Sequence, residues 1–101
     1  MEDATHGGPS HLGLGPAFPN PANPSVVISL SVAAEGPATV SLFNAAGQLV
    51  RVLYHGNLTV GRHRLQWDGR DEAGRPAAAG VYICRVRQGE RVEAIKLVRV
   101  E

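Results

Sequence analysis

The chain has 101 residues, which is enough for one domain with a single hydrophobic core and too few for two domains. Ten Lys and Arg residues against nine Asp and Glu residues leave a formal net charge of +1, which excludes the strongly basic surfaces that bind nucleic acids or anionic membranes. The one cysteine excludes an intrachain disulfide, and no apolar run approaches the roughly 18 residues of a membrane-spanning helix.

The N-terminal region has the composition of an arm. Residues 1–24 are rich in glycine and proline and show no hydrophobic period, which argues against a helix or a central strand. Closely spaced prolines in residues 18–24 favour an extended path along the domain. We therefore expect a disordered arm or linker over residues 1–15 and a folded domain over residues 16–101. Met1 is followed by two acidic residues and no apolar run, so we expect no signal peptide in the chain.

Alternating apolar and polar residues predict strands from residue 25 onward, separated by turns that contain glycine or proline. No segment has the 3.6-residue period of an amphipathic helix. Many short strands with closely spaced turns predict an all-β protein, an immunoglobulin-like antiparallel β-sandwich of about seven strands with an extended N-terminal arm. The predicted strands are 25–32, 38–44, 49–54, 58–60 (a short strand or an extended link), 62–67, 80–88 and 91–100.

Two residues are candidates for burial between the sheets. Trp67, the only tryptophan, alternates with polar residues along its strand, which favours a core position over a sugar-binding platform. Cys84 lies in an apolar run and has no base nearby in sequence, so we interpret it as a small buried hydrophobe rather than a catalytic thiol.

No pattern in the chain predicts catalysis or a bound cofactor. The four histidines, which are His6, His11, His55 and His63, have no metal-ligand spacing with a cysteine or a carboxylate. Asp68, Asp71 and Glu72 cluster in one loop, where their carboxylates could serve a calcium site or the backbone bonds of a tight turn. Turn chemistry is favoured, because Asp and Gly are the residues that tight loops use for their own backbone bonds. We expect no enzyme activity, no metal and no cofactor.

Several short motifs in the right order resemble a known family. They lie at residues 18–25 (FPNPANPS), 42–51 (LFNAAGQLVR), 61–71 (GRHRLQWDGRD), 74–76 (GRP), 80–82 (GVY) and 96–98 (KLV). Together they make residues 16–100 similar to the C-terminal sorting domain of type IX (Por) secretion cargo. The same residues are equally similar to the immunoglobulin-like domain of the flagellar hook-capping protein.

The resemblance implies a non-catalytic module that directs an exported protein to the cell surface. The implied partners are a secretion translocon or another protein, and a passenger domain upstream in the full-length protein. Nucleic acid and membrane insertion are not implied, and we expect a monomer at the cell surface or outside the cell. The residues it suggests for partner recognition are Pro19, Asn20, Pro21, Gly47, Gly80, Tyr82, Lys96, Leu97 and Val98.

The main alternative is a general immunoglobulin-like interaction or spacer module, of the flagellar hook-cap kind, in an extracellular protein. Several of the suggested residues also have plain structural explanations, since the glycines suit turns and Tyr82 suits packing. Lys96 and the edge of the last strand are the positions best placed to meet a partner, because an exposed edge can add a strand.

Overall fold

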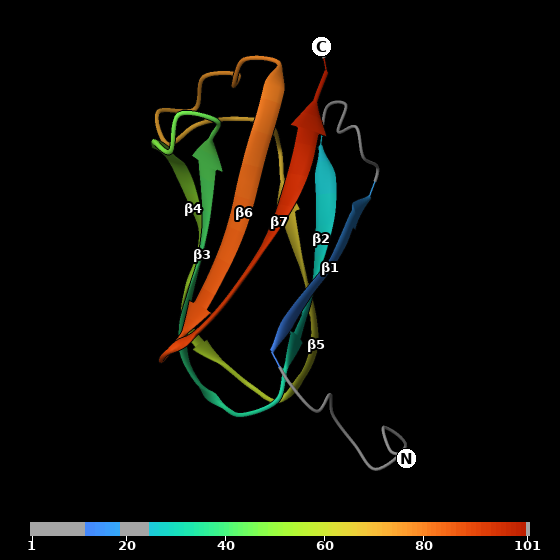
Figure 1. Cartoon of the computed structure of the whole chain (residues 1–101), viewed down its shortest axis with the longest axis vertical. Coiled ribbons are helices and arrows are strands. Elements are labelled where there is room, and N and C mark those ends of the chain that lie inside the picture. Colours follow the sequence, from blue (N-terminus) through green and yellow to red (C-terminus); the bar gives the residue numbers. More distant parts are fainter. Residues whose placement is uncertain (1–11, 19–24, 101) are drawn as a thin grey trace.

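The computed structural model describes residues 12–18 and 25–100, and within them every regular element is a β-strand (Figure 1). The strands are β1 (Gly13–Phe18), β2 (Val26–Val32), β3 (Gly36–Asn44), β4 (Leu49–Leu58), β5 (Gly61–Trp67), β6 (Gly80–Gln88) and β7 (Arg91–Arg99). The antiparallel pairs form two sheets, with strand order β1-β2-β5 in one (sheet A) and β4-β3-β6-β7 in the other (sheet B). The predicted all-β immunoglobulin-like sandwich is thus confirmed.

The core lies between the two sheets and follows the period-two pattern of the sequence. In β2 the buried residues alternate with more exposed ones, and β6 repeats this alternation. Each fully buried aliphatic side chain contributes about 1.5–3 kcal/mol relative to an exposed one, so the alternation fixes which face of each strand turns inward. The largest fully buried side chains are Trp67, Ile28, Leu30, Leu42, Leu97, Val26, Val32, Val40, Val86 and Cys84.

Trp67 closes the core at the end of β5, as the sequence predicted, with only 1% of its surface exposed. Its ring meets the ring of Tyr82 from the opposite sheet at 5.1 Å between centroids, in an edge-on arrangement. Such aromatic pairs add about 0.5–1.5 kcal/mol to the burial of their area. The pair therefore links the two sheets at one end of the sandwich.

The strands differ from the predicted ones mainly in β4 and β1, and β3 also begins two residues earlier than predicted, at Gly36. The predicted strand 49–54 continues through Gly56 to Leu58 as β4, because φ of 155° at Gly56 is a conformation that glycine adopts without strain. Residues 58–60 consequently form no separate strand. The glycine- and proline-rich region 1–24, in which no strand was predicted, contains β1 (Gly13–Phe18), which pairs with β2. β1 lies at the edge of sheet A, where proline is tolerated.

Candidate functional site

A cleft of about 570 Å³ opens at the end of the sandwich where the β3–β4 turn meets the loop between β5 and β6. We call it the loop-end cleft. Tyr82 forms part of its wall and donates a hydrogen bond from its hydroxyl to the carbonyl of Ala78. The lining residues are Asn44, Gln48, Leu49, Val50, Asp71, Glu72, Ala73, Arg75, Pro76, Ala77, Ala78 and Tyr82.

Asp71 organises the loop on one side of the cleft. Its carboxylate Oδ1 accepts hydrogen bonds from the backbone N–H groups of Ala73 (2.9 Å) and Arg75 (3.0 Å). Its own N–H donates to the carbonyl of Arg75, and its carbonyl accepts from Gly74, whose φ of 83° suits glycine. One side chain therefore satisfies the backbone of a tight turn, which gives this wall of the cleft a fixed shape.

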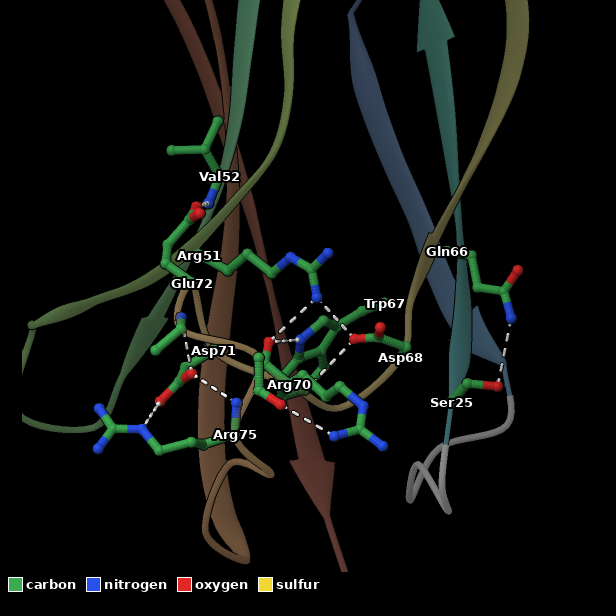
Figure 2. A network of polar contacts seen from close by, with 12 residues as sticks. Ser25, Arg51, Val52, Gln66, Trp67, Asp68, Arg70, Asp71, Glu72 and Arg75 are labelled. Carbon is green, nitrogen blue, oxygen red and sulfur yellow. Dashed lines mark hydrogen bonds and ion pairs between the residues drawn. The ribbon is translucent and has the colours of Figure 1, made fainter.

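The start of the same loop is bonded to the core tryptophan (Figure 2). Trp67 donates from Nε1 to the carbonyl of Arg70 at 2.9 Å, so its polar atom is satisfied at the border of the core. Asp68 Oδ1 accepts from the Arg70 N–H at 3.0 Å and from Arg51 Nη1 at 2.6 Å. Arg51 also reaches the carbonyl of Arg70 at 3.3 Å. The loop is thus held to β4 and to the core at one point.

Glu72 completes the edge of sheet B. Its Oε2 accepts a hydrogen bond from the Val52 N–H of β4 at 2.6 Å, and its own N–H donates to the carbonyl of Val50 at 3.1 Å. β4 is the edge strand of sheet B, so these backbone groups face away from β3. Glu72 takes the place of a further strand, and unpaired edge groups of this kind otherwise attract other chains.

Asp68 and Asp71 perform turn chemistry, the interpretation that the sequence favoured, because each accepts the backbone N–H of a residue two positions further along the loop. Glu72 instead accepts the Val52 N–H of β4, so the three carboxylates bond to different groups (Figure 2). Within residues 12–18 and 25–100, no three or more His, Cys, Asp or Glu side chains gather in a group that could hold a metal ion.

Among the residues suggested for partner recognition, three lie at the loop end. Gly47 is exposed in the β3–β4 turn with φ of 82°, and Gly80 begins β6 with φ of 145°. Tyr82 is 5% exposed and packs on Trp67. The two glycines shape turns and Tyr82 belongs to the core, so Tyr82 reaches the surface only where it lines the cleft.

The suggested residues of the last strand face opposite sides of sheet B. Leu97 pairs with Tyr82 and is fully buried, whereas Lys96, which pairs with Ile83, is exposed on the outer face. Val98 pairs with Val81 and is half-buried. The structure therefore brings Tyr82 and Leu97 together inside the core and sets Lys96 apart. The suggested residues Pro19, Asn20 and Pro21 lie outside the described residues.

The side chains with catalytic potential are engaged in packing or in hydrogen bonds. Cys84 is fully buried, and this burial raises the pKa of its thiol to about 12, so the thiol stays protonated at neutral pH. His63 Nε2 contacts the Thr59 carbonyl at 2.8 Å, and His55 Nδ1 contacts the Thr39 hydroxyl at 2.9 Å. Among the described residues, no carboxylate forms a hydrogen bond or an ion pair with either of these histidine rings, and His6 and His11 lie outside them.

Sequence reasoning missed Arg51, and it identified Glu72 only as a member of the acidic cluster in the loop, without its partner in β4. Arg51 lies 17 residues from Asp68, and Glu72 lies 20 residues from Val52. Only the fold brings these partners together, and no local pattern marks Arg51.

A comparison with protein families identifies the class of this protein. A model of the FlgD Ig-like domain family matches residues 19–92, and the chain belongs to this family. It is therefore a non-catalytic Ig-like module. No curated protein matches the chain. Among the described residues, no helix is long and apolar enough to cross a membrane.

Solved structures with the same fold come from larger proteins. The dimeric latent PorU of Porphyromonas gingivalis matches 84% of this chain at 20% identity and a TM-score of 0.65, over 9% of its own length. PorZ, a surface component of the type IX secretion system of the same organism, matches 85% at 22% identity and a TM-score of 0.57, over 11% of its length. FlgD of Xanthomonas campestris matches 88% at 26% identity and a TM-score of 0.60, over 67% of its length.

Proposed function

We propose that the chain is a sorting and anchoring module that directs an exported protein through a type IX-like secretion system to the cell surface. The observation that carries this proposal is the likeness to a small part of PorZ, which is itself a surface component of the type IX secretion system. The sequence motifs of residues 16–100 support it, since they resemble those of sorting domains at the C-terminus of such cargo. The partners in this proposal are an upstream passenger and the secretion translocon.

A module that is recognised while folded needs surfaces of fixed shape. The loop end meets this need, because Asp71 and Glu72 hold the loop with their own side chains. In the proposed role the translocon contacts the loop end, Lys96 and Val98 on sheet B, and the segment Pro19, Asn20 and Pro21. Gly47 and Gly80 shape the turns of the loop end, and Tyr82 and Leu97 support β6 and β7 from inside.

The test is a fusion of the complete chain to the C-terminus of an exported reporter in a type IX host. We expect the reporter at the cell surface, measured by protease accessibility of intact cells. The matched control is the same reporter carrying the Ig-like domain of Xanthomonas campestris FlgD, which shares the fold. A reporter that stays in the periplasm with the chain, or that both domains export equally, contradicts the proposal.

A second candidate is a general interaction or spacer module of the flagellar hook-cap kind in an extracellular protein. The family match over residues 19–92 and the likeness to FlgD of Xanthomonas campestris favour it. This candidate predicts that the chain fails to export the reporter but restores hook assembly when it replaces the Ig-like domain of that FlgD. Loss of assembly in the chimera argues against it.

A further inference from the structure

The outer face of sheet A carries a polar groove on the side of the sheet that faces away from the core. Its volume is about 400 Å³, and we call it the serine–arginine groove. β2 and β5 form it by register, because Ser29 pairs with Arg64 and Ser31 pairs with Arg62. The alternate residues of both strands turn inward, so these four side chains share the outer face. The lining residues are Gly15, Ser29, Ser31, Arg62, His63 and Arg64.

Glycine keeps the groove open on its β1 side. A side chain at Gly15 would place its Cβ 3.2 Å from the Cβ of Ser29, closer than ordinary side-chain contacts. The register of β1 against β2 also shifts between Leu14 and Ala17, and this irregularity lies beside Ser29. The floor of the groove therefore consists of backbone and two small hydroxyl side chains.

Among the described residues, no acidic side chain pairs with either arginine of the groove. Within residues 12–18 and 25–100, neither Arg62 nor Arg64 has an ion pair or a side-chain hydrogen bond, and β1, β2 and β5 contain no Asp or Glu. By contrast, Arg51 pairs with Asp68 and Arg75 pairs with Asp71 at the loop end. Two like charges side by side on one strand repel each other, and a bound anion removes this repulsion.

The chemistry of the groove selects among anionic partners. Guanidinium groups form paired hydrogen bonds with carboxylates, and the hydroxyls of Ser29 and Ser31 offer further donors beside each arginine. No Phe, Tyr or Trp side chain lines the described part of the groove, so it lacks the broad stacking surface that sugar or base binding uses. Two arginines in a chain with a net charge of +1 also provide too few contacts for tight nucleic-acid binding.

We propose that the serine–arginine groove binds an extended acidic segment of a partner protein. Arg62 and Arg64 are two residues apart on one strand, which separates them by about 6.8 Å along the strand. An extended peptide with acidic residues at alternate positions presents carboxylates on one face at the same spacing. Each carboxylate then pairs with one arginine and lies next to one serine hydroxyl. This inference does not depend on the sorting role, because it concerns a different face of the molecule.

The test uses the complete chain labelled with ¹⁵N and titrated with the peptide Ser-Glu-Ser-Glu-Ser-Glu-Ser. We expect amide shifts at Gly15, Ser29, Ser31 and residues 62–64, with binding that weakens as salt is added. The control peptide Glu-Ser-Ser-Glu-Ser-Ser-Glu has the same composition and puts neighbouring carboxylates on opposite faces. Equal binding of both peptides, or shifts confined to other surfaces, would overturn the proposal.

Matched variants distinguish binding at the groove from general attraction between the acidic peptide and a positively charged surface. R62Q/R64Q removes both cations of the groove, and R87Q/R91Q removes two exposed arginines of sheet B for the same change in charge. We expect a loss of roughly tenfold in affinity for the first and less than twofold for the second, since each exposed pair contributes modestly. The ¹H–¹⁵N spectra of both variants verify folding, and equal losses would contradict the proposal.

A sulfated oligosaccharide is the competing ligand class. A heparin-derived tetrasaccharide should bind more weakly than the alternating peptide if carboxylates and an extended backbone are recognised. Tighter binding of the saccharide with the same R62Q/R64Q dependence would overturn the peptide assignment. Peptide binding and reporter export are measured independently. Absence of peptide binding would contradict the groove proposal alone, and absence of export would contradict the sorting proposal alone.

Discussion

The sandwich core and the loop between β5 and β6 are stabilised in different ways. The core is a set of apolar side chains whose burial follows the alternation within each strand. The loop is held by directed hydrogen bonds that the carboxylates of Asp68, Asp71 and Glu72 accept from backbone N–H groups. Burial is non-directional and tolerates small shifts, whereas hydrogen bonds fix the positions of the groups that they join. The core therefore sets the global stability, and the loop sets the shape of the surface.

Trp67 belongs to both regions, and Trp67→Ala should have the largest effect. We expect a loss of roughly 3–5 kcal/mol in the free energy of unfolding, because the ring is fully buried and pairs with Tyr82. Urea denaturation measures it. Trp67→Phe keeps an aromatic ring and loses the bond to Arg70, so it should cost clearly less. A loss below about 1 kcal/mol for Trp67→Ala would show that the ring does not support the core.

The burial of the Cys84 thiol can be tested through the pH dependence of the free energy of unfolding. Burial raises the pKa of the folded thiol to about 12 from the 9.0 of a solvent-exposed cysteine, so the folded state holds this proton more tightly than the unfolded state. The contribution to stability is complete below pH 9 and is lost as pH rises toward 12, by about 1.4 kcal/mol per pH unit. Unfolding free energies of the wild type and Cys84→Ala, measured in parallel, should converge across this window. A constant difference would indicate an accessible thiol.

Asp71→Ala tests the loop. The change removes the acceptor of two backbone N–H groups, and we expect a loss of about 1–2 kcal/mol in the free energy of unfolding. Thermal denaturation measures the loss. Asp71→Asn keeps an acceptor oxygen and should lose less than half as much. Equal losses for both variants would assign the effect to the ion pair with Arg75, which is 3.6 Å long.

Glu72→Ala should act locally rather than globally. The Val52 N–H loses its acceptor, so its hydrogen exchange should become about fivefold faster, for a local loss near 1 kcal/mol. Amides of β2 in the other sheet report global opening and should change less. Uniform acceleration across both sheets would contradict a role limited to the β4 edge.

Arg51→Gln should have the smallest effect. Arg51 and Asp68 are both partly exposed, so the loss should stay below about 1 kcal/mol and shrink at high salt. A single nitrogen of Arg51, Nη1, donates to both Asp68 and the Arg70 carbonyl, so Arg51→Lys, which keeps the charge and a donor, should lose less than Arg51→Gln. A large loss independent of salt would show that Arg51 supports the loop by packing.

The sequence allowed the core to be predicted better than the surface. The inward faces of β2, β5 and β6 follow from alternation over adjacent residues, and so did the burial of Trp67 and Cys84. β1 was missed because glycine and proline hide its pattern, and only its pairing with β2 makes it a strand. In β1, pairing with a neighbouring strand therefore outweighs the low strand propensity of glycine and proline.

The polar contacts of the loop end could be predicted only in part. The Asp71 turn follows from the local run of Asp and Gly, because its bonds span two to four residues. The bonds of Arg51 and Glu72 join residues 17 and 20 positions apart, and their partners are set by how β4 passes the loop. The serine–arginine groove depends in the same way on the register of β2 and β5.

The direction of the outer strands has a mechanical consequence. β1 starts near one end of the long axis, and β7 runs alongside it to finish near the other end (Figure 1). A pull applied between Gly13 and Arg99 therefore slides each strand along its neighbour, β1 along β2 and β7 along β6. The ladder hydrogen bonds lie across that direction, so they are strained together rather than opened one after another. Tension along this axis meets the collective resistance of both ladders.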